Sequence, residues 1–246
     1  MASFDLRLGT AGWSIPAAVA DRFPGAGSSL ERYACVMTAV EVNSSFHRPH
    51  RRTTWERWAA STPDDFRFSV KVPRLLTHDQ RLADPDEVLD RFLGEVSGLG
   101  SKLAVILVQL PPSLKFDEVA ARGFFDALQA RFAAAVACEP RHADWFTAGA
   151  DAWLAERRIA RVAADPAKHT GAADPGGWRG LRYFRLHGSP RMYYSAYSPE
   201  VLAATARRLL ENAAGAPTWC VFDNTAGSAA LPDALTVRTA TGDERA

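Results

Sequence analysis

Short apolar runs that end in polar residues recur along the chain, and a segment long enough for a helix follows most of them. Their starts are about 30 residues apart, which is the length that a strand, a crossover helix and two loops need. Strands of a parallel sheet are covered on both faces, so they read as short and nearly continuous apolar runs. The pattern predicts eight parallel strands, at residues 6–10, 39–43, 66–71, 103–109, 135–139, 160–164, 182–186 and 218–222.

The segments between these runs carry the signals of helices. One helix start is marked by Ser198 as a cap and by Pro199 in the first turn, where proline is tolerated. Glycine, proline and aspartate in residues 166–181 favour a loop, so the sixth crossover is expected to be irregular. The predicted helices are at residues 28–38, 54–60, 85–96, 117–130, 148–157 and 199–212.

Eight parallel βα units imply one closed barrel. We therefore predict an α/β protein with a single (β/α)8 TIM-type barrel over residues 1–246 and a frayed tail at residues 239–246. Chains of this length routinely form such a barrel as one domain. No linker or low-complexity segment divides the sequence.

Side chains of a strand point alternately to its two faces, so the apolar positions indicate which polar residues face the barrel axis. Val40 and Val42 suit the helix-facing layer, which leaves Glu41 and Asn43 for the axis. Active sites of these barrels lie at the carboxyl ends of the strands. The polar residues expected at that mouth are Glu41, Asn43, Lys71, Gln109, Glu139, Arg141, Asp165, Arg185, His187, Asp223 and Asn224, with Tyr193 in the loop after His187.

The overall charge is balanced, with 29 Lys and Arg against 28 Asp and Glu. A net charge of +1 gives no global field to hold nucleic acid or an anionic membrane, so nucleic-acid binding would need a local patch. No apolar run approaches the roughly 18 residues of a membrane span, and no membrane partner is expected. The chain's start lacks a basic segment followed by an apolar one, and its three cysteines are far apart. We expect a cytoplasmic protein with reduced thiols.

Seven short segments resemble the DUF72 (YecE-like) family, and they occur in the family's order along nearly the whole chain. The resemblance implies a TIM-barrel fold and no established reaction, because the family is a domain of unknown function. The segments are Gly-Thr-Ala-Gly-Trp at 9–13, Val-Glu-Val-Asn-Ser-Ser-Phe at 40–46, Phe-Ser-Val-Lys at 68–71 with Thr77 and His78, Gln-Leu-Pro-Pro at 109–112, Glu-Pro-Arg-His at 139–142 with Trp145, Tyr-Phe-Arg-Leu-His-Gly at 183–188, and Phe-Asp-Asn-Thr at 222–225.

Three positions depart from the family's usual pattern. The family usually has Tyr where this chain has His47 and Phe where it has Pro140. It commonly has Asn at the position of Asp223, which adds a negative charge here. If the Asp223 side chain reaches the mouth, the ligand preference is expected to differ from that of relatives.

The first functional hypothesis is an acid–base enzyme of the hydrolase or isomerase type that acts on a polar or anionic small molecule. Glu41, Glu139 and His187 are the candidate catalytic residues, since a carboxylate and an imidazole exchange protons near neutral pH. Arg141 and Arg185 would hold a phosphate or carboxylate through paired hydrogen bonds. The further candidate ligand-binding residues are Asn43, Lys71, Gln109, Asp165, Asp223, Asn224 and Tyr193.

Other hypotheses stay open. Carboxylates and His187 are suitable ligands for a divalent metal, as in a hydrolase, an isomerase or a barrel nuclease, although three cations in the same mouth would repel the ion. No cofactor is predicted and no residue is assigned as a metal ligand. A binding module without catalysis is favoured by the tyrosine-rich loop 191–197, and a salt-bridge network that only closes the barrel is the purely structural alternative.

Lys71 raises a separate question, because a buried barrel lysine can become a nucleophilic amine that forms an imine with a carbonyl group. The acids expected around it would hold it protonated. The sequence therefore favours Lys71 as a positive point charge.

Overall fold

The computed structural model describes residues 5–242 of the chain. Its strands follow the predicted positions closely. They are β1 (Leu6–Thr10), β2 (Ala39–Val42), β3 (Arg67–Lys71), β4 (Leu103–Gln109), β5 (Ala135–Glu139), β6 (Ile159–Arg161), β7 (Ala163–Asp165), β8 (Gly176–Gly177), β9 (Arg182–Leu186) and β10 (Thr218–Phe222). All eight predicted runs form strands, and the sixth is divided at Val162 into β6 and β7.

The strands form two hydrogen-bonded sheets. One has the order β1-β10-β9-β7 and the other β2-β3-β4-β5-β6-β8. All neighbours are parallel except β8, which pairs antiparallel with β6. The predicted α/β class with parallel strands is thus confirmed, whereas the predicted closed (β/α)8 barrel is not, because the backbone hydrogen bonds divide the strands into two sheets. Residues 166–181 contain β8 and no helix, which confirms the irregular sixth crossover.

The boundary between β1 and β2 is filled by side-chain oxygens. The backbone N–H of Leu8 donates to Thr38 Oγ1 at 3.0 Å, and that of Thr10 donates to Tyr33 Oη at 2.9 Å. The Tyr33 hydroxyl then donates to the carbonyl of Ala39 at 3.0 Å. These hydroxyls take the places that backbone carbonyls and amides have in a ladder, which explains why the two sheets do not join along these strands.

The two strands still approach each other closely. A Cβ atom at Gly9 would lie 2.3 Å from the carbonyl oxygen of Ala39, so only glycine fits there. Beyond β1, Ala11 and Glu41 form an isolated parallel bridge, and Gly12 N donates to Glu41 O at 2.9 Å. The carboxyl ends of β1 and β2 are therefore held together.

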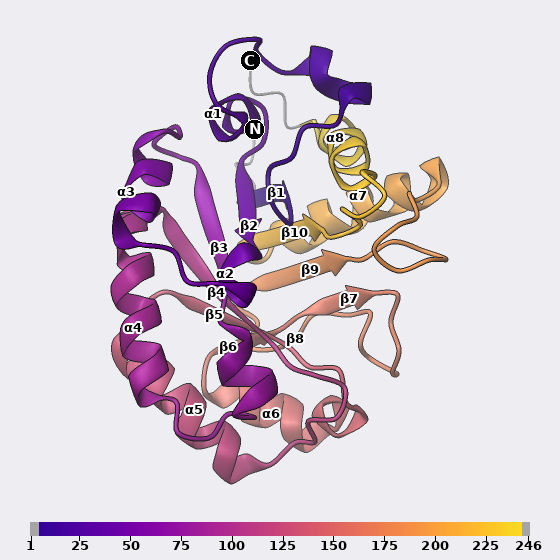
Figure 1. The fold of residues 1–246 in the computed structure, drawn as a ribbon. Helices are drawn as coiled ribbons and strands as arrows, with labels where there is room; N and C mark the ends of the chain where they lie inside the picture. The colour runs from indigo at the N-terminus through magenta and orange to yellow at the C-terminus, as the bar shows by residue number, and fades with distance from the viewer. Residues whose placement is uncertain (1–4, 243–246) are drawn as a thin grey trace.

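Helices cover the outer faces of both sheets. Figure 1 shows α3, α4 and α5 following one another outside β2–β6, while α7 and α8 lie beside β10 and β1. The six predicted helices are present with ends shifted by a few residues. The helices are α1 (Ser29–Ala34), α2 (Ser44–His47), α3 (Arg52–Ala60), α4 (Asp86–Val96), α5 (Glu118–Arg131), α6 (Ala148–Glu156), α7 (Pro199–Ala213) and α8 (Ala230–Thr241).

Two helices were not predicted, α2 and α8. The first has only four residues, too few to show a period. The second corrects the predicted frayed tail at 239–246, because α8 continues to Thr241 and ends at Gly242 in a left-handed conformation with φ of 69°. Residues 243–246 lie outside the described part of the chain. None of the helices between residues 5 and 242 is long and apolar enough to cross a membrane.

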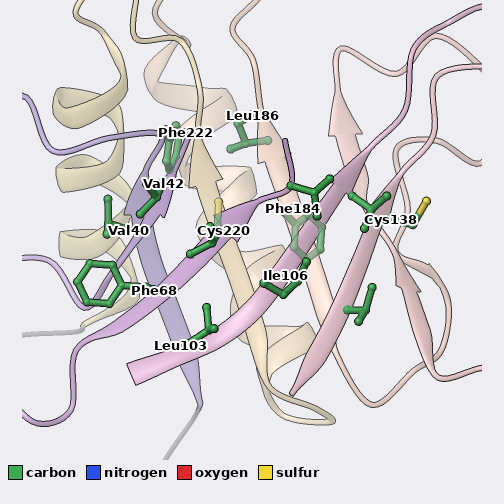
Figure 2. Packing of buried hydrophobic residues seen from close by; sticks show 14 of the residues in the cluster. Val40, Val42, Phe68, Leu103, Ile106, Cys138, Phe184, Leu186, Cys220 and Phe222 are labelled. Atoms are coloured by element: carbon green, nitrogen blue, oxygen red, sulfur yellow. The ribbon is translucent and has the colours of Figure 1, made fainter. Parts of the chain in front are cut away.

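The core has two layers, as the alternation predicts. Side chains between the sheets and the helices form the outer layer, which Figure 2 shows with Val40, Phe68, Ile106 and Phe184 among its members. The opposite face of each sheet, here called the inner face, is turned toward the other sheet. Its apolar cluster comprises Ala39, Val105, Leu107, Ala137, Ala160, Val162, Leu181, Tyr183, Trp219 and Val221.

On the inner face, apolar side chains precede charged ones along several strands. Ala39 is followed two residues later by Glu41, and Ala137 by Glu139. Tyr183 precedes Arg185 in the same way. The apolar cluster therefore fills the amino-terminal part of the interior, and the charged residues gather at the carboxyl ends of the strands.

Candidate functional site

Arg185 on β9 is the centre of a buried ion-pair network. Its Nε donates to Glu41 Oε2 at 3.0 Å, and its Nη2 donates to Glu41 Oε1 at 2.6 Å. Nη1 donates to Glu139 Oε2, and Nη2 also donates to Asp223 Oδ2 at 3.0 Å. Burial alone would lower the pKa of Arg185, but the three carboxylates raise that pKa well above its ordinary value. The guanidinium is therefore permanently charged and fixed.

A tyrosine lies below this network. The Tyr183 hydroxyl lies 2.9 Å from Glu41 Oε2 and 2.9 Å from Ser69 Oγ, and all three side chains are fully buried. Burial and the neighbouring Glu41 raise the pKa of Tyr183 well above its usual value, so it stays a neutral phenol. Both oxygens of Glu41 are thus occupied, by Arg185 and by Tyr183.

His187 lies between two carboxylates. Its Nδ1 is 3.0 Å from Asp223 Oδ2, and its Nε2 is 3.0 Å from Glu139 Oε1. Nε2 is also 3.1 Å from Arg141 Nη2, which can only donate. When Nε2 carries a proton it can donate to Glu139, and when it does not it can accept from Arg141. The imidazole therefore has a partner in either protonation state.

The two carboxylates beside His187 stay ionised. Burial would raise the pKa of Glu139, but Arg185, Arg141 and His187 together hold it well below its ordinary value. Burial also opposes ionisation of Asp223, and Arg185, His187 and Lys71 lower its pKa. Negative charge near His187 is therefore permanent at neutral pH.

Arg141 borders the network without being saturated by it. Its Nη2 forms an ion pair with Glu139, while its Nε is buried and has no hydrogen-bond partner. The neighbouring Asn43 is similar, because its Nδ2 lies 3.4 Å from Asp223 Oδ1 and its buried Oδ1 is unpartnered. One donor and one acceptor are thus left open beside Glu139 and Asp223.

Lys71, the last residue of β3, stands apart from the ion pairs. Only 8% of it is exposed, and its Nζ lies 4.0 Å from the centre of the Phe46 ring. Burial and the repulsion of Arg185 lower its pKa to about 8, although Glu41, Glu139 and Asp223 act in the opposite direction. The nearby acids favour the protonated form of Lys71, as expected, but burial and the charge of Arg185 oppose them, so more of the amine is neutral than in an ordinary lysine.

Gln109 and Tyr193 lie at the edge of the network. Gln109 is in register with Glu139 on the neighbouring strand, and its Nε2 donates to the carbonyl of Leu110 at 2.9 Å. The Tyr193 ring meets His187 edge to face with 5.6 Å between centroids, and 40% of Tyr193 is exposed. Tyr193 thus covers His187 from the solvent side.

The structure does not bring Asp165 and Asn224 into the network. Asp165 is in register with the outer-layer residue Leu186, and it accepts a hydrogen bond from Tyr197 Oη at 2.8 Å. Asn224 points to α8, where its Nδ2 donates to Asp233 Oδ2 at 2.7 Å. Both lie on the outer face, one residue out of phase with the inner positions of their strands.

Ser69 and Tyr183 lie two residues before Lys71 and Arg185, so the same alternation along the strand puts them on the inner face, but no sequence pattern assigned them a role in the site. Phe46, which contacts Lys71, was missed as a site residue because it lies in the short helix α2. It also borders a cavity of about 280 Å³ whose lining includes His50, Trp55, Arg74 and Phe92. The cavity therefore lies beside Phe46, and the network carboxylates Glu41, Glu139 and Asp223 do not line it.

Nothing in residues 5–242 brings three His, Cys, Asp or Glu side chains together in an arrangement that fits a metal ion. The three carboxylates of the network converge on the Arg185 guanidinium, which occupies the position that a cation would need. The donor set therefore does not fit the metal-dependent hypothesis.

Comparisons with known proteins agree with the fold. The profile of a family described as "Protein of unknown function DUF72" matches residues 7–246. The chain is 31% identical over 144 residues to the UPF0759 protein YecE of Escherichia coli (strain K12), covering 56% of this chain and 52% of that protein. It is 28% identical over 111 residues to the UPF0759 protein YunF of Bacillus subtilis (strain 168), covering 43% and 39%. The chain thus spans about half the length of these curated relatives.

Two solved structures of DUF72 proteins are similar over nearly the whole chain. A protein from Enterococcus faecalis V583 superposes with a TM-score of 0.83 at 20% identity, covering 98% of this chain and 97% of its own. One from Thermotoga maritima MSB8 gives 0.79 at 23% identity, covering 97% and 99%. At these identities the likeness concerns the fold alone.

Proposed function

The chain belongs to the DUF72 family, and we propose that it is an enzyme that binds a small polar or anionic molecule at the carboxyl ends of the strands and moves a proton through His187. The observation that carries the proposal is the pairing of Nε2 of His187 with both Glu139, an acceptor, and Arg141, a donor. A group that has a partner in both protonation states can gain or lose a proton without leaving a buried polar atom unsatisfied.

Glu41 has a supporting role in this proposal. Both of its oxygens are bonded to Arg185 or Tyr183, and the residue is fully buried, so it holds Arg185 in place instead of accepting a proton from a ligand. Glu139 and Asp223 orient the imidazole from its two sides. Tyr193 covers the ring and is displaced when a ligand reaches it.

The unsatisfied groups beside the network support an anionic or polar ligand. A buried N–H without an acceptor costs free energy, so a ligand oxygen that pairs with Arg141 Nε gains a charge-assisted hydrogen bond. Asn43 Oδ1 offers an acceptor to a hydroxyl or amine of the same ligand. Lys71 adds positive charge, since it forms no ion pair with any carboxylate in the described part of the chain.

Ligand binding is tested by thermal unfolding in EDTA against a panel of small carboxylates and phosphates. We expect at least one anion to raise the melting temperature of the wild type, and Arg141→Gln to remove that shift. Arg122→Gln, which alters an exposed pair with Glu118, is the matched control and should keep the shift. A panel without any shift, or a shift that Arg141→Gln retains, would refute the binding site.

Catalysis is tested with the anions that bind. Wild-type protein is incubated with mixtures of metabolites of that class, and conversion is followed by mass spectrometry. His187→Asn should bind the ligand and abolish conversion. An anion that binds at Arg141 and is never converted would instead support the non-catalytic binding module.

We also propose that the two sheets are parts of one (β/α)8 barrel. Support comes from the Ala11–Glu41 bridge at one boundary and from Val162, which alone separates β6 from β7 at the other. The Gly12 amide that donates to Glu41 O lies at the first boundary. Slow hydrogen exchange of that amide, measured by NMR, is the expected result, and exchange at the rate of an exposed loop would contradict closure there.

A further inference from the structure

We propose that Lys71 is a nucleophilic amine that forms an imine with an aldehyde or ketone carrying an anionic group. The inference deepens the proposed function, on which it rests for the anionic part of the ligand, by naming the reacting group of that ligand. It also gives a role to the one cation of the site that the ion-pair network leaves out.

The first argument is the isolation of the Lys71 amine. Lys71 is in register with the inner-face residue Leu107, so its side chain extends into the interior where the network lies. Each nearby carboxylate is already committed: Glu41, Glu139 and Asp223 all receive hydrogen bonds from Arg185. Within residues 5–242 Lys71 forms an ion pair with none of them, and the Phe46 ring is the contact of its Nζ. A structural lysine in a charged interior would be expected to pair.

The second argument is the supply of neutral amine, because only the unprotonated form attacks a carbonyl carbon. The groups that face Lys71 electrostatically are Arg185, Glu41, Glu139 and Asp223, with His78 in the helical turn Leu75–Asp79 after β3. The combined effect of burial and of these charges lowers the pKa of Lys71 to about 8. At pH 7.5 about a quarter of such a lysine is neutral, compared with about 0.1% of an ordinary one.

The backbone at Lys71 is also fixed. The hydroxyl of Ser45 lies 2.7 Å from the carbonyl of Lys71 and 3.0 Å from that of Val42, which ties the end of β3 to the start of α2. The same helix carries Phe46. The backbone segments that carry the amine and the aromatic ring are therefore tied together, which favours a preorganised nucleophile.

The reaction needs no further reagent. The lone pair of Nζ attacks the carbonyl carbon to form a C–N bond, and the carbonyl oxygen takes up the proton that the nitrogen loses. The resulting hydroxyl takes up the second proton of the nitrogen and leaves as water while the C=N bond forms, so one amine and one carbonyl give one imine and one water without oxidation or reduction. A protonated imine weakens bonds at the adjacent carbon, and proton transfer by His187 is the chemistry that such an intermediate requires.

The test is reductive trapping with glyoxylate, which carries both an aldehyde and a carboxylate. Sodium cyanoborohydride converts an imine into a stable N-carboxymethyl lysine, and peptide mass spectrometry identifies the modified residue. The chain has four lysines, Lys71, Lys102, Lys115 and Lys168. Lys115 and Lys168 are exposed and serve as internal references. At pH 7.5 we expect Lys71 to be modified at least about tenfold faster than either reference.

Acetaldehyde in place of glyoxylate provides the first control, since it lacks the anion. Modification of Lys71 should be several times slower with acetaldehyde, and an added anion that raises the melting temperature should slow modification by glyoxylate. Equal rates with both aldehydes would overturn the anionic part of the inference. Lys168→Arg is the matched control variant and should leave modification of Lys71 unchanged.

Lys71→Arg separates the inference from the proposed function. If Lys71 in the wild type is modified no faster than Lys168 while anions still stabilise both the wild type and Lys71→Arg, the imine is refuted and the anion site stands. If Lys71 is trapped but no anion stabilises the protein, the amine is reactive and the anion site fails. The melting curve of Lys71→Arg without ligand verifies that this variant folds. If the variant does not fold, the trapping result on the wild type still decides the inference.

Discussion

Arg185 on β9 binds Glu41 on β2 through two nitrogens, at 3.0 and 2.6 Å, and thereby joins two strands that belong to different sheets. Both residues are buried, and Tyr183 and Ser69 extend the same connection one layer deeper. The network at the strand ends therefore has a structural task as well as the chemical one proposed for it. Glu41 and Tyr183 serve the structural task alone, whereas Glu139 and Asp223 contact both Arg185 and His187.

Arg185→Met should destabilise the fold strongly, because it leaves three buried carboxylates without their shared cation. We expect a loss of about 3–5 kcal/mol in the free energy of unfolding, measured by urea denaturation. Arg122→Met on the exposed face of α5 should change it by less than about 0.5 kcal/mol. Equal effects of the two substitutions would show that the buried network contributes nothing specific.

Acid should unfold the protein through Glu139 and Asp223. Their pKa values are lower in the folded protein than in the unfolded chain, so the stabilisation they give is complete at neutral pH and is lost as the pH falls below about 4. Urea denaturation between pH 3 and 7 measures this slope. Glu139→Gln should be less stable at neutral pH and show a shallower loss toward acid, whereas the exposed Glu156→Gln should follow the wild type. An unchanged slope in Glu139→Gln would contradict the assignment.

Alkaline pH tests Lys71 independently of any ligand. Its pKa is about 8 in the folded protein and about 10.5 in the unfolded chain, so the unfolded state binds more protons between these values and stability rises with pH in this window. Lys71→Met removes the cost of burying the ammonium and should be more stable at pH 7 by roughly 2 kcal/mol. The difference between variant and wild type should shrink as the pH approaches 10. A constant difference would mean that Lys71 has an ordinary pKa.

Gly9→Ala tests the close approach of β1 to β2. A Cβ atom there meets Ala39 O at 2.3 Å, which forces the strands apart and should cost about 2 kcal/mol or more. Gly123→Ala in α5 is the matched control, because nothing lies within 4 Å of its Cβ position. The control should gain about 0.5–1 kcal/mol from helix propensity. A tolerated Gly9→Ala would show that the boundary between the sheets is loose.

Alternation along the strands accounts for most of what the sequence could predict about the site. Counting every second residue from Ala39 leads to Glu41 and Asn43, and counting from Tyr183 leads to Arg185 and His187. The same count from Val162 passes over Asp165. Asp165 was included only because it ends a run, and the structure places it on the outer face.

Other features depend on contacts that no local pattern contains. The partners of Arg185 are more than 30 residues away along the chain, and packing decides which carboxylate each nitrogen meets. The division into two sheets depends on the position of the Tyr33 hydroxyl, which extends from α1 and accepts the hydrogen bond of the Thr10 amide. Lys71 shows the same limit for electrostatics, because its pKa depends on burial and on the position of Arg185.

Arg185 donates four hydrogen bonds to carboxylates, and this has a consequence for evolution and engineering. The buried foundation of the site consists of Arg185, Glu41 and Tyr183, which no ligand needs to contact. Its border includes Lys71, whose amine forms no ion pair in the described part of the chain, and Tyr193, which is partly exposed. In the proposed enzyme, substrate preference can then drift through the border residues without the chain losing its ability to fold. A selection library for new activities in this protein should accordingly randomise the border and leave the foundation intact.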